Sequence, residues 1–431
     1  MLEPAPPERP AAADWKRIFA VYWITSVIEG AGVSQVYALL PQLLTSMGVT
    51  GPDRLGFVGL FGALLFLLGM PLVPLWGVWA DRYSRKAVIA RSAVVEAVVF
   101  TGMALAREPW HVALSMLLIG FQLGNTGVMI AGIRDIAPRG RLGTIIAAFG
   151  ASGPIGFAVG PILAGFLIDG AGWSISGVFG LSAALSLGTA GLVAFGSREI
   201  RPAVVPQGRL LTLAFGAVRG VISDRAVRRV FVIFGLAFLA TQMSRPYLPV
   251  IVEAVHPPGP GLASAIGLVS GTAALAGALL APFAGALGDR IGFRPVLIAA
   301  LAVGAVALLL IPAAAPLAGI AGLAALAVAS YAAAATTSSM VIGLLATEVP
   351  EERRSQTLNL VYLPLYAAGI VGPAIGGVVS SRAGVPAPFI AGAGALLLGA
   401  IVVWRTHVGA GSTRPDPTDR GLAAAEVAET G

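Results

Sequence analysis

Twelve long runs of apolar residues dominate the sequence. Crossing the hydrocarbon core of a bilayer takes about 20 residues of α-helix, and each run reaches or approaches that length. The runs do not alternate apolar and polar residues with a period of two, which argues against a membrane β-barrel. The sequence therefore predicts an all-α polytopic membrane protein. We expect the spans at 18–44, 55–79, 88–106, 110–133, 143–168, 173–195, 230–254, 262–287, 295–313, 316–346, 357–380 and 386–404.

Composition indicates that lipid, not water, surrounds most of the chain. Of the 431 residues, 57% are hydrophobic and only 11% are charged, whereas a soluble protein carries charge on about a quarter of its residues. The net charge of +7 does not indicate nucleic-acid binding, because the basic residues stand in short clusters between the apolar runs. The chain has no cysteine, so neither a disulfide framework nor a thiolate metal site is expected.

The distribution of Lys and Arg predicts the orientation, since positively charged loops resist translocation. With twelve spans, 24 of the 28 basic residues fall on one side, among them the four in 82–91. Arg54, Arg107 and Arg382 fall on the other side, and Arg245 lies inside a span. Both termini are therefore predicted to be cytoplasmic. The first run has the length of a span and no small-residue cleavage site after it, so we expect it to be retained.

Two motifs recur in the second half of the chain. Gly77-Val-Trp-Ala-Asp-Arg-Tyr-Ser-Arg-Lys closes the second run, and Gly285-Ala-Leu-Gly-Asp-Arg-Ile-Gly-Phe-Arg closes the eighth, 208 residues later. Gly160-Pro161 in the fifth run is matched 212 residues later by Gly372-Pro373. An internal duplication into two parallel six-span halves follows. We expect disordered tails at 1–14 and 406–431, bundles at 15–196 and 230–405, and a cytoplasmic linker at 197–229 with a candidate surface helix at 208–222.

These motifs resemble those of the major facilitator superfamily, and in particular its twelve-span drug:proton antiporter branch. The resemblance covers about residues 15–405. It implies a monomeric transporter with alternating access, whose two halves rock about a central site lined mostly by spans 1, 4, 7 and 10. It also assigns gating to the two motifs, which here comprise Gly77, Asp81, Arg82, Arg85, Gly156, Gly160, Pro161, Gly285, Asp289 and Arg290.

Each motif has a physical interpretation and a structural alternative. Asp81 is a carboxylate at a helix end among cations, placed to meet Arg85, a neighbouring helix N-terminus, or both. Ser84 stands where the family usually has glycine. The alternative is that this motif only marks topology and staples a loop. The glycines around Pro161 allow another helix to approach closely, which suits either a gating interface or ordinary packing in a bundle.

Polar groups inside the predicted spans indicate a functional site, because an ionisable residue at the bilayer centre costs at least about 2.5–3.5 kcal/mol. Glu29 lies about 17 Å and Arg245 about 23 Å along their spans from the cytoplasmic side. The candidate substrate- and proton-binding residues are Glu29, Gln122, Asn125, Gln242, Arg245, Tyr331 and Thr336. The uncharged members are alternatively interhelical hydrogen bonds worth about 0.6 kcal/mol each.

One departure from the family pattern affects the mechanism. The family commonly has an arginine in span 4 that is linked to proton transfer, whereas this sequence has Met116 and no basic residue in that span. Glu29 is then the candidate proton carrier, if its carboxyl moves between a site near Arg245 and a site without it. Coupling to another ion and facilitated transport are the alternatives. Glu96, in the third span, is expected to be a structural partner.

The sequence predicts a secondary transporter of the plasma membrane that exports amphipathic small molecules in exchange for protons. The alternatives are uptake or facilitated transport of a specific anionic or zwitterionic solute and, more remotely, a non-transporting membrane sensor. An enzyme is not favoured, because no histidine lies deep in a span and no paired carboxylates share a helix face. The sequence has no phosphate-binding Gly-x-x-x-x-Gly-Lys-Ser/Thr loop, which disfavours ATP-driven transport. No cofactor is expected.

The predicted topology can be tested by labelling single introduced cysteines, since the chain has none of its own. Cysteines in place of Glu3, Leu210 and Pro415 should react only with reagents that reach the cytoplasm. Those in place of Pro52 and Pro258 should react with an impermeant maleimide added outside. The opposite pattern in either group would contradict the arrangement of twelve spans with both termini inside.

Overall fold

The structure, a computed structural model, describes residues 12–202, 205–223, 225–256, 258–348 and 362–405. Every regular element in these ranges is helical, which confirms the predicted all-α class. The predicted tail 406–431 lies outside the described residues, as does most of 1–14. The helices are α1 (Ala12–Ser46), α2 (Gly51–Leu67), α3 (Gly69–Arg82), α4 (Arg85–Ala104), α5 (Pro109–Leu118), α6 (Asn125–Ile136), α7 (Leu142–Gly150), α8 (Ser152–Gly165), α9 (Ile175–Gly196), α10 (Leu210–Ser223), α11 (Arg225–Ser244), α12 (Leu248–Val255), α13 (Leu262–Ile291), α14 (Phe293–Glu348), α16 (Tyr362–Ala383) and α17 (Ala387–Arg405).

Eleven stretches of the described residues are long and apolar enough to cross a membrane, and they coincide with the second to twelfth predicted spans. The first predicted span coincides with α1, a 35-residue helix that carries Glu29 and Gln35 near its middle and is therefore more polar. Because α1 packs against α8 and α9 inside the molecule, its polar groups face protein. The structure is thus consistent with twelve spans.

Several spans that were predicted as continuous helices are interrupted. Span 4 consists of α5, the short 3₁₀ helix η1 (Ile119–Gln122) and α6, with Gly124 between them at φ 98°. Span 7 changes from α11 to α12 through a 3₁₀ turn, η4 (Arg245–Tyr247), that contains Pro246. A positive φ favours glycine, and proline removes a backbone donor, so both breaks have a local cause. Span length and apolarity, on which the predicted spans rest, do not reveal such breaks.

The ninth and tenth predicted spans, 295–313 and 316–346, join in the single element α14. The helical path is broken at Gly319, which has φ 60° and ψ −162°. The predicted break at 314–315 is therefore displaced toward the C-terminus. Glycine adopts this conformation without the steric cost that a side chain would add.

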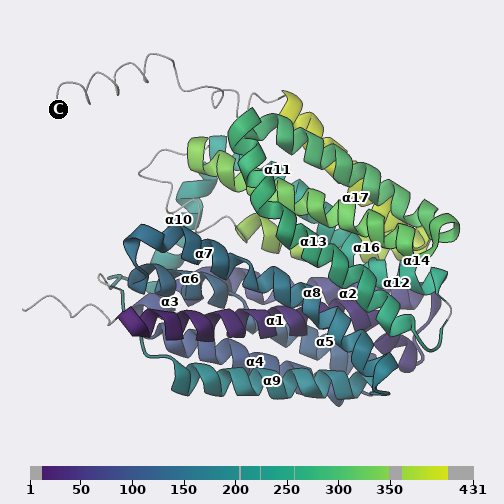
Figure 1. The fold of residues 1–431 in the computed structure, drawn as a ribbon, viewed down its shortest axis with the longest axis horizontal. Coiled ribbons are helices and arrows are strands. Elements are labelled where there is room, and N and C mark those ends of the chain that lie inside the picture. The colour runs from purple at the N-terminus through teal and green to yellow at the C-terminus, as the bar shows by residue number, and fades with distance from the viewer. Residues whose placement is uncertain (1–11, 203–204, 224, 257, 349–361, 406–431) are drawn as a thin grey trace, which may run out of the picture.

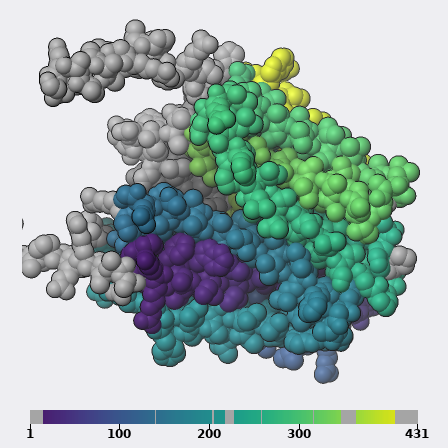
Figure 2. Space-filling view, viewed as in Figure 1, coloured from purple at the N-terminus to yellow at the C-terminus, as the bar shows by residue number. Residues whose placement is uncertain are grey.

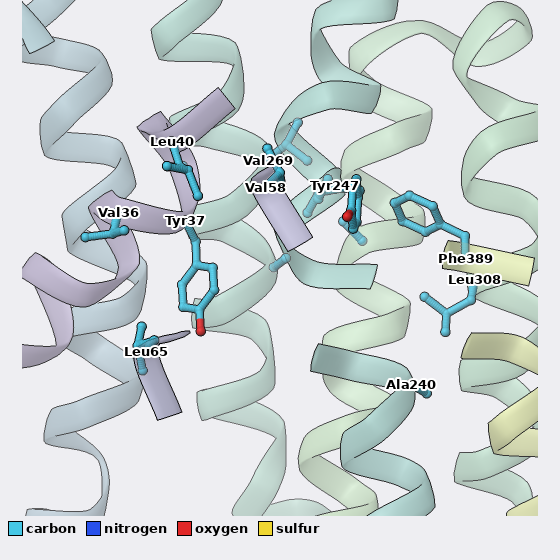
Figure 3. Close-up of a cluster of buried hydrophobic side chains, with 14 of the residues drawn as sticks. Val36, Tyr37, Leu40, Val58, Leu65, Ala240, Tyr247, Val269, Leu308 and Phe389 are labelled. Atoms are coloured by element: carbon cyan, nitrogen blue, oxygen red, sulfur yellow. The ribbon is translucent and has the colours of Figure 1, made fainter. Parts of the chain in front are cut away.

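The helices form two groups, with α1 to α9 in one and α11 to α17 in the other (Figure 1). Two helix pairs make the most extensive contacts between the groups, since α2 packs against α16 and α8 packs against α13. In the space-filling view the blue and teal helices of the first group meet the green helices of the second along one seam (Figure 2). The buried hydrophobic cluster crosses this seam, and Val36, Val58, Val269 and Phe389 belong to it (Figure 3).

Contacts between the two groups concentrate at the predicted outer end. Arg54 Nη1 lies 2.9 Å from Glu253 Oε2 in an ion pair between the groups. The Tyr247 hydroxyl donates to the Leu55 carbonyl at 3.0 Å. At the predicted cytoplasmic end, no salt bridge joins the two groups among the described residues. Among the described residues, the two groups are therefore bridged by polar contacts at the predicted outer end.

The outer ion pair predicts a conformational effect. Glu253→Gln removes one charge of a partly exposed pair, and such pairs contribute about 0.2–1 kcal/mol. The outward-open population should therefore rise about 1.5- to 5-fold. This can be measured as faster labelling of a cysteine at Ser34, a buried cavity position, by an impermeant maleimide added outside. Arg107→Gln, on an exposed loop residue, is the control. An unchanged labelling rate in Glu253→Gln would contradict a latch role.

Candidate functional site

The loop after α3 is organised by one buried guanidinium group. Arg85 begins α4 and its side chain is 2% exposed. Its Nε and Nη2 atoms each lie 2.8 Å from Asp81 Oδ1, and Nη1 lies 2.6 Å from Asp135 Oδ2 at the end of α6. Asp135 was not among the candidates predicted from the sequence. Two carboxylates therefore hold the ends of two spans against one cation.

The hydrogen bonds of Ser84 account for a serine at the position where the family usually has glycine. Its hydroxyl accepts from the Ala87 amide at 3.0 Å, which caps α4, and donates to a carboxylate oxygen of Glu199. The Arg85 amide donates to the other Glu199 oxygen at 2.8 Å. A carboxylate at a helix N-terminus is favoured by the helix dipole. The linker is thus bound to the start of α4, and Arg82 adds a hydrogen bond of 2.8 Å to the Gly208 carbonyl.

The repeat of this motif in the second half is built differently. Asp289 and Arg290 lie exposed at the end of α13. Within the part of the chain that the structure describes, neither takes part in a salt bridge. Gly77 and Gly285 both have open space where a Cβ would be. Among the described residues, the two copies therefore share a sequence pattern, but only the first forms a charge network.

The glycine and proline motif in α8 faces two neighbours. A Cβ on Gly156 would lie 2.3 Å from the Val27 carbonyl oxygen, and one on Gly160 would lie 2.2 Å from that of Ala31. Both contacts are with α1 in the same half. The Pro161 carbonyl in turn contacts Gly267 of α13, whose Cβ would lie 2.3 Å from it. The motif thus packs α8 closely against α1 and also against α13 of the other half. The same glycines and proline can therefore serve both helix packing and gating.

Glu29 is enclosed within the first half. Its side chain is buried, and the Asn125 side-chain amide donates to Glu29 Oε1. Asn125 is held in turn, because its own oxygen accepts from the Thr126 amide at 2.9 Å. No hydrogen bond or ion pair joins Glu29 to Arg245 in the described residues. The predicted approach of these two charges is therefore absent in this conformation.

Arg91 is the functional candidate that the sequence analysis missed. It was counted with the basic loop residues of 82–91, yet it lies within α4 and within the predicted span 88–106. Its Nη2 donates to the carbonyls of Gln122 and Leu123 at 3.3 and 3.4 Å, and its guanidinium lies 3.7 Å from the centre of the Trp76 ring. It also interacts electrostatically with Glu29. Its place among apolar neighbours was the signal available in the sequence.

Gln122 contributes its backbone to this cluster. The end of η1 leaves its carbonyl free of helical partners, and the Ser92 hydroxyl donates to it at 2.9 Å. Glu96 is fully buried beside the cluster and accepts from the Ser186 hydroxyl of α9 at 3.2 Å. Its other oxygen, Oε1, is buried without a hydrogen-bond partner among the described residues. Glu96 thus links α4 to α9 through Ser186; its structural role remains a prediction.

A second set of candidates lines a cavity between the halves. Arg245 projects there from η4, and its guanidinium carbon lies 5.8, 5.4 and 5.5 Å from the ring centres of Tyr37, Phe157 and Tyr331. These rings belong to α1, α8 and α14, so both halves contribute. The remaining lining residues are Ser34, Ala38, Pro161, Pro249, Ser270 and Ala274.

Two of the predicted residues are not among those that line this cavity. Gln242 is buried, its Cβ faces Gly372 of α16, and its side chain interacts with Tyr37, one of the lining rings. Thr336 is half-buried in α14 and is not among the residues that line the central cavity. A separate cavity lies within the second half, between α11, α14 and α17, and includes Thr241, Ser330, Thr337 and Ser338. The face of span 10 that meets the centre is therefore the one with Tyr331.

Sequence comparison decides the family. The sequence profile described as Major Facilitator Superfamily matches residues 22–258 and 230–429. The chain belongs to this superfamily. Its arrangement of two helical groups around a central cavity is the fold expected of that family, and members of it are transporters rather than enzymes.

Curated relatives and solved structures of this superfamily extend the likeness over most of the chain. Multidrug resistance protein MdtG of Citrobacter koseri is 29% identical over 398 residues, which is 91% of this chain and 95% of that protein. MdtG of Escherichia coli K12 is 28% identical, with 93% and 97% covered. A bacterial homolog of the human lysosomal transporter Spinster, in an inward-facing conformation, has a TM-score of 0.75 at 14% identity, with 94% and 100% covered. The human organic anion transporter MFSD10 has a TM-score of 0.64 at 18% identity, with 92% and 100% covered.

The Arg85 network predicts different outcomes for the two copies of the first motif. Asp81→Asn should lower transport severely while membrane abundance stays near that of the wild type, because Asp135 still holds Arg85 and a partly exposed charge contributes little to stability. Asp289→Asn, at the equivalent position of the second copy, is the matched control and should change transport far less. Solute flux per protein molecule in proteoliposomes measures both. Equal losses in the two variants, or none in Asp81→Asn, would contradict a gating role for Asp81.

Proposed function

We propose that the chain is a proton-coupled exporter of amphipathic small molecules that works as a monomer by alternating access. In this proposal it lies in the plasma membrane with both termini in the cytoplasm. The relatives named multidrug resistance protein support export of this kind. The observation that carries the coupling is the enclosure of Glu29, a carboxyl group buried inside the first half with an amide donor and a nearby cation.

The surroundings of Glu29 suit a group that gains and loses a proton. An isolated charge in a dry interior is costly, so a buried carboxyl must be neutral or balanced by a cation. Arg91 supplies that cation, and it is fixed by backbone carbonyls and by Trp76 rather than by a salt bridge of its own. Glu29 can therefore be accommodated in either state. In this proposal Arg91, from span 3, supplies the cation in a chain that lacks the span-4 arginine common in the family.

Alternating access supplies the second condition for exchange. The proton on Glu29 must be exposed to opposite sides of the membrane at different stages, which requires that its affinity differ between the two conformations. Asn125 begins α6 directly after the break in span 4. A change at this break would move the amide donor relative to Glu29. The interruption of span 4 thus gives the site a part that can respond to the conformation of the bundle.

A second candidate function is transport of a specific anionic solute without proton coupling. The observation that favours it is Arg245, a basic residue in the cavity between the two halves. Uptake and facilitated diffusion both fit that feature alone. The buried carboxyl and its cation have no role in such a carrier, which is why we favour exchange with protons.

The test is Glu29→Gln in proteoliposomes with an imposed pH gradient. Glutamine keeps the shape and the hydrogen bond with Asn125 but cannot carry a proton. Flux driven by the pH gradient should be abolished, whereas substrate binding and downhill exchange should persist. Glu108→Gln, on the exposed loop before α5, is the control and should transport like the wild type. Accumulation by Glu29→Gln at the wild-type rate would exclude Glu29 as the carrier.

A further inference from the structure

Arg245 lies in the central cavity, and no salt bridge joins it to any other of the described residues. Three aromatic rings surround its guanidinium within 6 Å, the range in which a ring face attracts a cation. Its Nε atom is buried and has no hydrogen-bond partner among the described residues. The rings therefore keep the side chain in place while leaving its positive charge uncancelled.

The rest of the cavity lining is free of charge. The residues that surround it are apolar or carry hydroxyl groups, and none of those that the structure describes is acidic. Glu29 is not among them. A cationic solute would meet Arg245 with no carboxylate to offset the repulsion. An anionic solute would meet a guanidinium group with unused donors, which is the strong kind of hydrogen bond to a carboxylate or sulfonate.

We infer that the transported substrate is an amphipathic organic anion, whose carboxylate or sulfonate binds Arg245 and whose aromatic part packs against Tyr37, Phe157 and Tyr331. This assignment rests on the proposed exchange with protons and names its substrate class. Because the rings come from both halves, an occupied site contacts α1 and α8 on one side and α14 on the other. A site built in this way changes when the halves rock, as alternating access requires.

A consequence for the driving force follows from the charges. In a one-for-one exchange, a proton enters as an anion leaves, so two elementary charges cross the membrane in the same electrical sense. An inside-negative membrane potential then drives both movements. Exchange of a proton for a monovalent cation would move no net charge. The response to membrane potential therefore separates an anionic substrate from a cationic one.

Binding tests the site directly. The probes are 2-naphthoate and 2-naphthalenesulfonate, with 2-naphthylmethylammonium as the cation of matched size, each titrated by calorimetry into the purified full chain. The wild type should bind the anions in preference to the cation. Arg245→Gln should weaken anion binding about 10- to 100-fold, the loss typical of a charged hydrogen bond, and Arg245→Lys should recover part of it. Arg107→Gln, on an exposed loop, should bind like the wild type.

Three outcomes would overturn the inference: equal or tighter binding of the cation by the wild type, no binding of either anion, or unchanged anion binding in Arg245→Gln. Should Arg245→Gln fail to fold, protection of the wild type against heat by 2-naphthoate but not by the ammonium compound supplies the same evidence. Equal protection by both compounds would contradict the inference.

Flux separates this inference from the proposed function. Anion export from proteoliposomes with a valinomycin-imposed, inside-negative potassium potential should be faster than export at zero potential. No effect of the potential on anion export would contradict exchange of protons for anions. Glu29→Gln should bind 2-naphthoate like the wild type while losing pH-driven flux. Anion binding without any pH-driven flux in the wild type would refute the proposed proton coupling and leave the anion site standing.

Discussion

Backbone polar groups inside this bundle must find their partners within the protein, because hydrocarbon offers none. The break in span 4 shows the consequence most clearly. The carbonyls of Gln122 and Leu123 lose their helical partners there, and Arg91 together with Ser92 replaces them. Arg91 is thus a cation inside the first half whose hydrogen bonds satisfy the backbone carbonyls that the break leaves free. The same break starts α6 at Asn125, which reaches Glu29.

Three arginines in or next to the spans meet the cost of desolvation in three ways. Arg85 is paired with two carboxylates and fixes the ends of α3, α4 and α6. Arg91 is held by carbonyl groups and an indole ring. Among the described residues, Arg245 is contacted by three aromatic rings and forms no salt bridge. Carboxylates neutralise the charge of Arg85, and carbonyl groups offset that of Arg91 in part. Aromatic rings leave most of the charge of Arg245 in place. Arg85 therefore has a structural role, whereas the charge of Arg245 remains available to an anion.

Much of the fold was predictable because lipid imposes length and apolarity on each span. Those constraints act on runs of about 20 residues, so they show in a single sequence. Breaks such as those at Gly124 and Pro246 were not predictable, since glycine and proline also occur inside intact membrane helices. Their effect depends on which neighbour is present to satisfy the freed carbonyls, and sequence spacing does not identify that neighbour.

The candidate site also has a part that was predictable from the sequence and a part that was not. Glu29 and Arg245 were recognisable because charge is rare inside spans, but their partners were not. The offset of 212 residues placed them on related faces, and this suggested a mutual approach that is absent here. Arg91 escaped notice because it stands near the end of a span, where a basic residue ordinarily marks the cytoplasmic side. Only the packing of α4 against η1 and α3 shows that its side chain turns inward.

The separation of Glu29 from the cavity raises the question of how one site affects the other. Both lie along α1, since Tyr37 follows Glu29 by about two turns, or about 12 Å. Gly156 and Gly160 bring α8 so close to α1 that no side chain fits between the two backbones. Closely packed contacts of this kind resist separation, so we expect α1 and α8 to move together and Phe157 to move with Tyr37. In the proposed exchange, a proton that changes the position of α1 would then change two of the three rings around Arg245, without direct contact between the two charges.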